Sequence, residues 1–153
     1  MTDATEIHQI LQELLQGQRL AVLATVAAEE PRRPYTNLIA FTATADLKEV
    51  LFATPRATRK FADLTATPHV SLLVDNRSHR ETDFGEAAAV TVLGTASELL
   101  EPERERYQAI YLAKHPYLRD FVTAPTCALI RVRVEKYILV TRFQEVHEVV
   151  PAS

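Results

Sequence analysis

The stretch VLFATPRATRKFADLTATPHVSLLV, residues 50–74, decides the fold of this chain. Two runs rich in β-branched and aromatic residues frame it, EVLFAT (49–54) and HVSLLVD (69–75), and both have the composition of β-strands. Between them, TRKFADLTA (58–66) has the apolar spacing of a short helix, which Pro68 should end. We therefore predict a strand, a turn, a short helix and a second strand in succession.

The turn and the first residues of this helix carry an unusual charge pattern. Arg56, Arg59 and Lys60 fall here, and no acidic residue occurs from Val50 to Ala62. The amino end of a helix carries partial positive charge, so cations are unfavourable there unless an anion binds. The sequence therefore predicts an anion site, for which a phosphate group is the best candidate.

Two threonines could complete this anion site. Thr54 and Thr58 could each donate a hydroxyl hydrogen bond, while Arg59 could bind bidentately and Lys60 as a point charge. The alternative interpretation is that the basic side chains are solvated and that Thr58 only caps the helix. The chain has only 3 glycines and neither of the glycine-rich nucleotide motifs, so a phosphate would be held without such a loop.

Composition restricts the class of protein. The chain has 153 residues, 47% of them hydrophobic, which fits one domain with one core. Its net charge of −3 argues against a nucleic-acid binder or a protein of anionic membranes. The single cysteine, Cys127, lies in an apolar segment, so we expect a buried thiol and a reducing, cytoplasmic compartment. Neither a signal peptide nor an apolar run of about 20 residues is visible.

The rest of the chain supplies more strands than helices. The strands are too close together for parallel crossovers, which favours an α+β, mainly β fold: an antiparallel barrel with short flanking helices. His115-Pro116 should break the second long helix, and Gly94 should mark a bulge. The expected elements are helices at 3–17 and 101–121, strands at 19–27, 34–44 and 89–99, a charged loop at 76–87, and one or two closing strands after residue 126.

These segments resemble the pyridoxamine 5'-phosphate oxidase-like, FMN-binding split β-barrel family. In that family a strand ends in Thr, a Ser/Thr-Arg-Lys triplet opens the helix, and P-x-V-S-L-L begins the next strand, as in residues 50–74 here. The likeness extends over about residues 8–143, with weaker flanks than centre. It implies a single-domain split barrel that forms a homodimer with two FMN sites at the interface.

The resemblance also implies where FMN would bind. The residues implied for the phosphate and ribityl chain are Thr54, Thr58, Arg59 and Lys60. The residues implied beneath the isoalloxazine are Asn37, Leu38, Ile39 and Ala40, and two further implied contacts are Asn76 and Arg77. No metal site is expected, because the 5 histidines show no ligand spacing.

The implied activity is that of an FMN-dependent oxidoreductase acting on an unknown small molecule or electron donor. The chain departs from the oxidase itself at Asn37, Thr42 and Ala89, where the oxidase has basic residues and a glutamine. The oxidase's arginine-histidine substrate motif near the carboxyl end is replaced by Arg142 and His147 at another spacing. The resemblance therefore supports the flavin site more strongly than oxidation of pyridoxamine phosphate.

Other interpretations remain open at this point. Related split barrels use deazaflavin or haem instead, and a flavin protein can also be a carrier or sensor without turnover. His147 is the loose candidate for a haem ligand. We expect Tyr111 and His115, near the place where the oxidase takes its substrate phosphate, to be structural, and Tyr137 and Phe143 to belong to the core.

Overall fold

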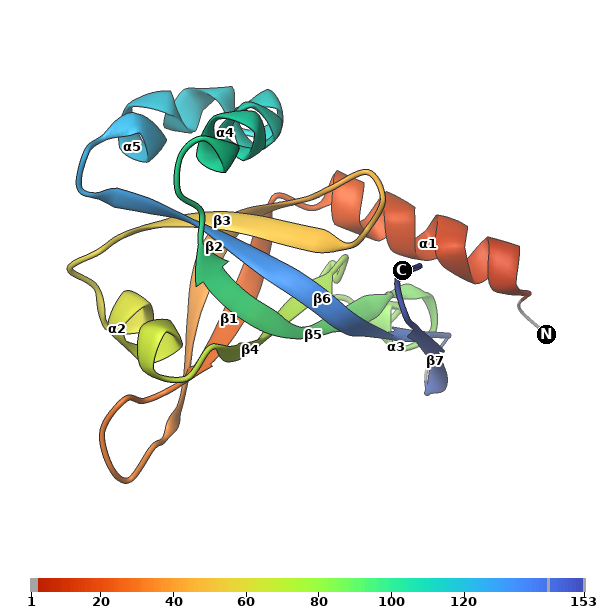
Figure 1. Ribbon diagram of the computed structural model, residues 1–153. Coiled ribbons are helices and arrows are strands. Elements are labelled where there is room, and N and C mark those ends of the chain that lie inside the picture. The colour runs from red at the N-terminus through yellow and green to blue at the C-terminus, as the bar shows by residue number, and fades with distance from the viewer. Residues whose placement is uncertain (1–2, 143, 153) are drawn as a thin grey trace.

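The computed structural model describes residues 3–142 and 144–152 and shows a closed antiparallel barrel (Figure 1). Its strands follow the order β3-β2-β1-β4-β5-β6, and β3 pairs with β6 to close the ring, while β7 adds to the outer side of β6. The strands are β1 (Leu20–Val26), β2 (Pro34–Ala43), β3 (Glu49–Pro55), β4 (His69–Asp75), β5 (Ala89–Glu98), β6 (Cys127–Thr141) and β7 (Glu145–Val149). The predicted antiparallel barrel with short helices is confirmed.

The first helix, α1 (Ala4–Gly17), is capped by Asp3 and carries a buried apolar stripe. The Asp3 carboxylate accepts a hydrogen bond from the Glu6 backbone N–H, and the buried leucines of α1 join the barrel core. These leucines are Leu11, Leu14 and Leu15. The helix ends at Gly17.

The predicted helix over 101–121 is divided into three pieces. They are α4 (Glu103–Lys114), a 3₁₀ turn η1 (Pro116–Leu118) and α5 (Arg119–Thr123), with the break at His115-Pro116 as predicted. Apolar side chains of α4 and α5 pack on the outward faces of β3 and β6, forming a second cluster outside the barrel. Arg131 of β6 is therefore partly covered and lies beside Glu49 and Glu103.

Gly94 allows β5 and β6 to bend together. The register between these strands shifts at Leu93 and Gly94, which confirms the predicted bulge. A Cβ at Gly94 would lie 2.5 Å from the backbone oxygen of Arg133, so only glycine fits. Beyond the bend β6 is free to pair with β3 on its other edge, through Cys127 to Arg133.

The barrel is split beside its second helix, α2 (Arg59–Ala66). β2 pairs with β3 only over Phe41–Ala43, so residues 34–40 of β2 pair with β1 alone. α2 precedes β4, and a single-turn helix, α3 (Asp83–Glu86), follows it within the segment that we expected as a loop (76–87). Figure 1 shows α2 and α3 at opposite ends of the barrel.

Within the described part of the chain, no helix combines the length and apolar character needed to cross a bilayer.

Candidate functional site

The amino end of α2 is built by two threonine hydroxyls. Thr58 is the N-cap and accepts a hydrogen bond from the Phe61 backbone N–H at 3.3 Å, as the alternative interpretation required. Its own hydroxyl lies 2.9 Å from the Pro55 carbonyl, to which it donates, and 2.9 Å from the hydroxyl of the buried Thr54. An anion would therefore have to draw these hydroxyl protons away from local acceptors.

Arg59 and Lys60 extend from the first turn of α2 without a carboxylate partner. Among residues 3–142 and 144–152, no ion pair involves either side chain. The Arg59 guanidinium stands 5.2 Å from the centre of the Tyr35 ring, a cation–π distance. Burial lowers the pKa of Lys60, because the surrounding protein disfavours the charged form. A bound anion would offset that penalty.

Arg56 corrects the expectation of three unpaired cations. Its guanidinium forms an ion pair with Glu98 on β5 at 2.6 Å and donates to the Pro125 carbonyl at 2.9 Å. Hydrogen bonding to Glu98 raises the pKa of Arg56. Glu98 is 42 residues away in sequence, so a local charge count could not reveal the pair. The candidate anion site therefore has two available cations.

The β2 segment expected beneath a flavin ring lies along the split. Leu38 exposes 67% of its surface, whereas Ile39 faces the core. The Asn37 side-chain oxygen is buried and accepts no hydrogen bond from any described residue. Asn37 shares a face of β2 with Tyr35, on whose ring Arg59 stacks. An acceptor without a donor therefore lies on the face of β2 that carries the ring against Arg59.

Asp63 is a residue that shapes the site and that the sequence did not reveal. This buried carboxylate of α2 accepts from the Ala28 backbone N–H at 3.0 Å and from the Thr25 hydroxyl at 3.4 Å. It thereby fixes the hairpin between β1 and β2 against α2. No sequence signal identifies it, because an acid in a short helix is most often solvated.

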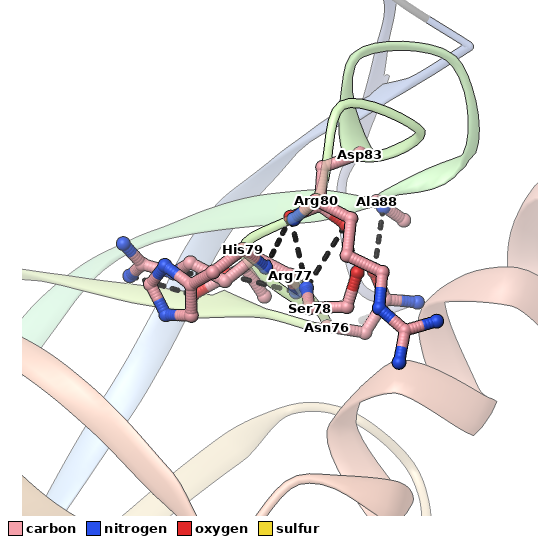
Figure 2. Close-up of polar contacts among 8 residues, drawn as sticks. Asn76, Arg77, Ser78, His79, Arg80, Asp83 and Ala88 are labelled. Atoms are coloured by element: carbon pink, nitrogen blue, oxygen red, sulfur yellow. Dashed lines mark hydrogen bonds and ion pairs between the residues drawn. The ribbon is translucent and has the colours of Figure 1, made fainter.

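The other predicted contacts, Asn76 and Arg77, lie beyond the far end of β4 (Figure 2). The Asn76 side-chain oxygen accepts from the Ala88 backbone N–H at 2.8 Å. Arg77 binds the Asp75 carboxylate through two hydrogen bonds of 2.6 and 3.0 Å. One chain therefore does not bring these residues together with Arg59, and their contact with a cofactor stays a prediction.

The same loop is organised by Asp83. Its carboxylate accepts from the Ser78 hydroxyl and backbone N–H, at 2.7 and 2.9 Å, and from the His79 backbone N–H at 2.7 Å (Figure 2). These hydrogen bonds, with those from Ser78 the strongest, lower the pKa of Asp83 to about 2. The carboxylates Asp75 and Asp83 at this end of the barrel are therefore both engaged by residues of the same segment.

Tyr111 and His115 have the environment expected of structural residues. The Tyr111 hydroxyl donates to the Ala40 carbonyl at 2.9 Å, and His115 Nε2 lies 2.7 Å from the Phe41 carbonyl. Burial lowers the pKa of His115, so the neutral ring is favoured. Tyr137 lies in the core as predicted, whereas Phe143 is outside the described residues. No group of three or more His, Cys, Asp or Glu side chains in the described residues is arranged to hold a metal.

The family of the chain follows from its sequence profile. A family model described as pyridoxamine 5'-phosphate oxidase matches residues 7–141. This chain belongs to the pyridoxamine 5'-phosphate oxidase family. No curated protein sequence matches the chain significantly.

Solved structures share the fold of this oxidase family member. A haem-binding protein from Mycobacterium smegmatis is 14% identical with a TM-score of 0.79, covering 91% of this chain and 55% of its own. Campylobacter jejuni ChuZ is 12% identical with a TM-score of 0.82, covering 98% of this chain and 61% of its own. An FAD-binding protein from Mesorhizobium loti is 17% identical with a TM-score of 0.66, and the likeness covers 90% of this chain and 93% of that protein's chain. The chain thus spans little more than half of the first two proteins, and at these identities the likeness shows a shared fold.

Proposed function

We propose that this protein binds FMN at the split between β2 and β3 and acts as an oxidoreductase on a small molecule. The observation that carries the proposal is the pair of cations on the first turn of α2, Arg59 and Lys60, which have no carboxylate partner among the described residues. Membership of the pyridoxamine 5'-phosphate oxidase family supports a flavin as the anion-bearing ligand.

A phosphate alone would bind too weakly to be a specific ligand. Charge-assisted hydrogen bonds contribute about 1.5–3 kcal/mol each, and micromolar binding needs about 8 kcal/mol. The remaining free energy must come from a flat, largely apolar group, for which the unpaired edge of β2 offers a surface. A ribityl hydroxyl would supply the donor that the Asn37 oxygen lacks.

The side chains of this chain bind and orient rather than perform acid–base chemistry. When bound, the isoalloxazine supplies hydride transfer. Arg59 and Lys60 would fix the phosphate end, while the backbone of Asn37–Ala40 would position the ring edge. Thr42 and Asn37 replace basic residues of the oxidase itself, so we propose a substrate other than pyridoxamine phosphate.

We also propose that the protein is a homodimer. Leu38, Val22 and Leu73 are neighbours in register across β2, β1 and β4, so their side chains form one outward apolar stripe. Leu38 and Leu73 expose 67% and 36% of their surfaces, and Leu20 on the same face of β1 exposes 56%. A second copy would cover this stripe.

Sedimentation of the wild type should give twice the monomer mass, and Leu38→Asp should give monomers. A wild-type monomer would contradict the proposed homodimer.

Haem is the second candidate ligand. The M. smegmatis neighbour is named a haem-binding protein, and Vibrio cholerae HutZ, named a haem storage protein, is 18% identical with a TM-score of 0.66. In this chain the candidate imidazole is His147 on β7, whose Nε2 lies 3.0 Å from the Glu145 carboxylate. A haem site would depend on His147 and not on Lys60, so the two ligands can be separated.

The visible spectrum of the purified protein, followed by titration with FMN, tests the proposed function. We expect flavin absorption bands and tight FMN binding that Arg59→Ala and Lys60→Ala each weaken by about tenfold or more. Haemin is the parallel ligand, with His147→Ala as its variant. Binding of haemin but not FMN would replace the flavin proposal, and binding of FMN without reduction by NADH or NADPH would indicate a carrier or sensor.

A further inference from the structure

A hollow of about 520 Å³ lies beside the candidate phosphate site, between the β1–β2 hairpin and α2. Figure 1 shows the hairpin loop and α2 at the same end of the barrel. Its wall includes the cations Arg33 and Arg59, the ring of Tyr35, and three acids: Glu29, Glu30, which pairs with Arg32 at 3.1 Å, and the buried Asp63. A volume of this order is typical of ligand pockets, so the hollow can hold a group as large as a nucleoside.

Arg59 lies both at the candidate phosphate site and in the wall of the hollow. It begins α2 beside the Thr58 cap, and it also lines the hollow, where its guanidinium faces the Tyr35 ring. A ligand whose first phosphate lies at the cap would therefore meet the hollow directly beyond that phosphate. Arg33 supplies a second cation to the wall. Two arginines in one wall suit a pyrophosphate better than a single phosphate.

The rest of the wall suits a nucleoside. Tyr35 and the Arg59 guanidinium are planar surfaces on which a base can stack. Glu29 offers carboxylate acceptors for ribose hydroxyls or an exocyclic amino group. Polar and apolar surfaces are mixed in the wall, which disfavours a lipid or a purely apolar ligand.

The hollow is preformed. The buried Asp63 carboxylate holds the Ala28 backbone, and the Ala27 backbone N–H donates to the Arg33 carbonyl at 2.9 Å to close the hairpin. A ligand would not have to order this loop, which lowers the free-energy cost of binding.

We propose that this hollow binds the adenylate half of a dinucleotide flavin, so that the protein prefers FAD to FMN. This inference rests on the proposed flavin site, because the phosphate at the α2 cap anchors the ligand that reaches into the hollow. The second phosphate would lie between Arg59 and Arg33, and the adenine would stack at Tyr35.

Calorimetric titration of the full-length protein with FMN, FAD and ADP tests the inference. We expect FAD to bind about tenfold more tightly than FMN, and Arg33→Ala to weaken FAD about fivefold while changing FMN less than twofold. Arg80→Ala is the control, because Arg80 is an exposed cation beyond β4 that does not line the hollow. That control should leave all three affinities unchanged.

The outcomes separate the inference from the proposed function. Equal affinities for FMN and FAD would overturn the inference and leave the flavin proposal intact. Failure of both flavins to bind would overturn the flavin proposal; ADP binding that Arg33→Ala weakens would then still support an adenylate site. Absence of both FAD and ADP binding would overturn the inference.

Discussion

The two ends of β4 carry similar basic residues and use them differently. At the α2 end, Arg59 and Lys60 have no carboxylate partner among the described residues. At the α3 end, Arg77 is held by both oxygens of Asp75. A basic residue therefore indicates a binding site only when its neighbours leave the charge available, and the α2 end meets that condition.

The same contrast occurs within a single turn. Arg56 and Arg59 are three residues apart, yet Glu98 on β5 reaches only Arg56. β5 brings this carboxylate to the turn, and α2 carries Arg59 away from it. The comparison between available and satisfied cations can be tested at each of these positions.

The largest effect is expected from removing both available cations. Arg59→Ala with Lys60→Ala should weaken FMN binding by about a hundredfold or more, because each loses a charge-assisted contact to the phosphate. Arg77→Ala should change FMN binding by less than about threefold, since its charge is already satisfied by Asp75. Fluorescence quenching of FMN measures both. Equal losses of FMN affinity in the two variants would contradict the proposed difference between the available cations Arg59 and Lys60 and the paired Arg77.

The next largest effect is expected on stability, at the acidic residues near the two ends of β4, Asp63 and Asp83. Asp63→Ala should lower the free energy of unfolding by about 2–3 kcal/mol, because it leaves the Ala28 N–H without its acceptor inside the protein. Asp63→Asn, which keeps an acceptor oxygen, is the control and should cost less. Asp83→Ala should leave global stability almost unchanged, since Asp83 begins the single-turn helix α3 outside the barrel core, but should speed amide exchange at Ser78 and His79. Urea unfolding and hydrogen exchange measure these effects, and similar unfolding midpoints for Asp63→Ala and Asp83→Ala would contradict the expectation.

The stability of the protein should depend on pH through the buried His115, whereas FMN affinity should not depend on this residue. Burial lowers the pKa of His115, so as pH falls below about 6.5 the unfolded chain takes up a proton before the folded protein does. Stability should therefore be lost as pH falls from 7 to 5, by a few degrees in Tm, and His115→Gln should reduce this dependence. FMN affinity of His115→Gln at pH 7 should stay near that of the wild type. An unchanged pH dependence in the variant would assign the loss to other groups.

The smallest effect is expected at Arg56. Because Glu98 and the Pro125 carbonyl already occupy its guanidinium, Arg56→Ala should change FMN affinity less than about twofold. Arg59→Ala, three residues away, is the comparison within the same titration. A loss at Arg56 as large as that at Arg59 would mean that the ligand displaces Glu98.

Local periodicity was enough to predict most elements. β4 was predicted with its observed bounds, and the bulge at Gly94 and the break at His115-Pro116 follow from residues with restricted or permissive backbones. The 3₁₀ turn η1 and the single turn of α3 were not predicted. Such short helices depend on what they pack against, and tertiary packing contributes most of their stability.

The sequence by itself determined the strands, the helix that follows β3, and the concentration of cations at its start, because strand alternation, helix spacing and local charge are properties of neighbouring residues. Only the tertiary structure decided which of these cations are available. The Arg56–Glu98 pair, the anchoring of Ala28 by Asp63, and the unsatisfied oxygen of Asn37 all depend on segments that the barrel brings together. Charge interactions and hydrogen bonds act over a few ångströms in space, whatever the separation along the chain.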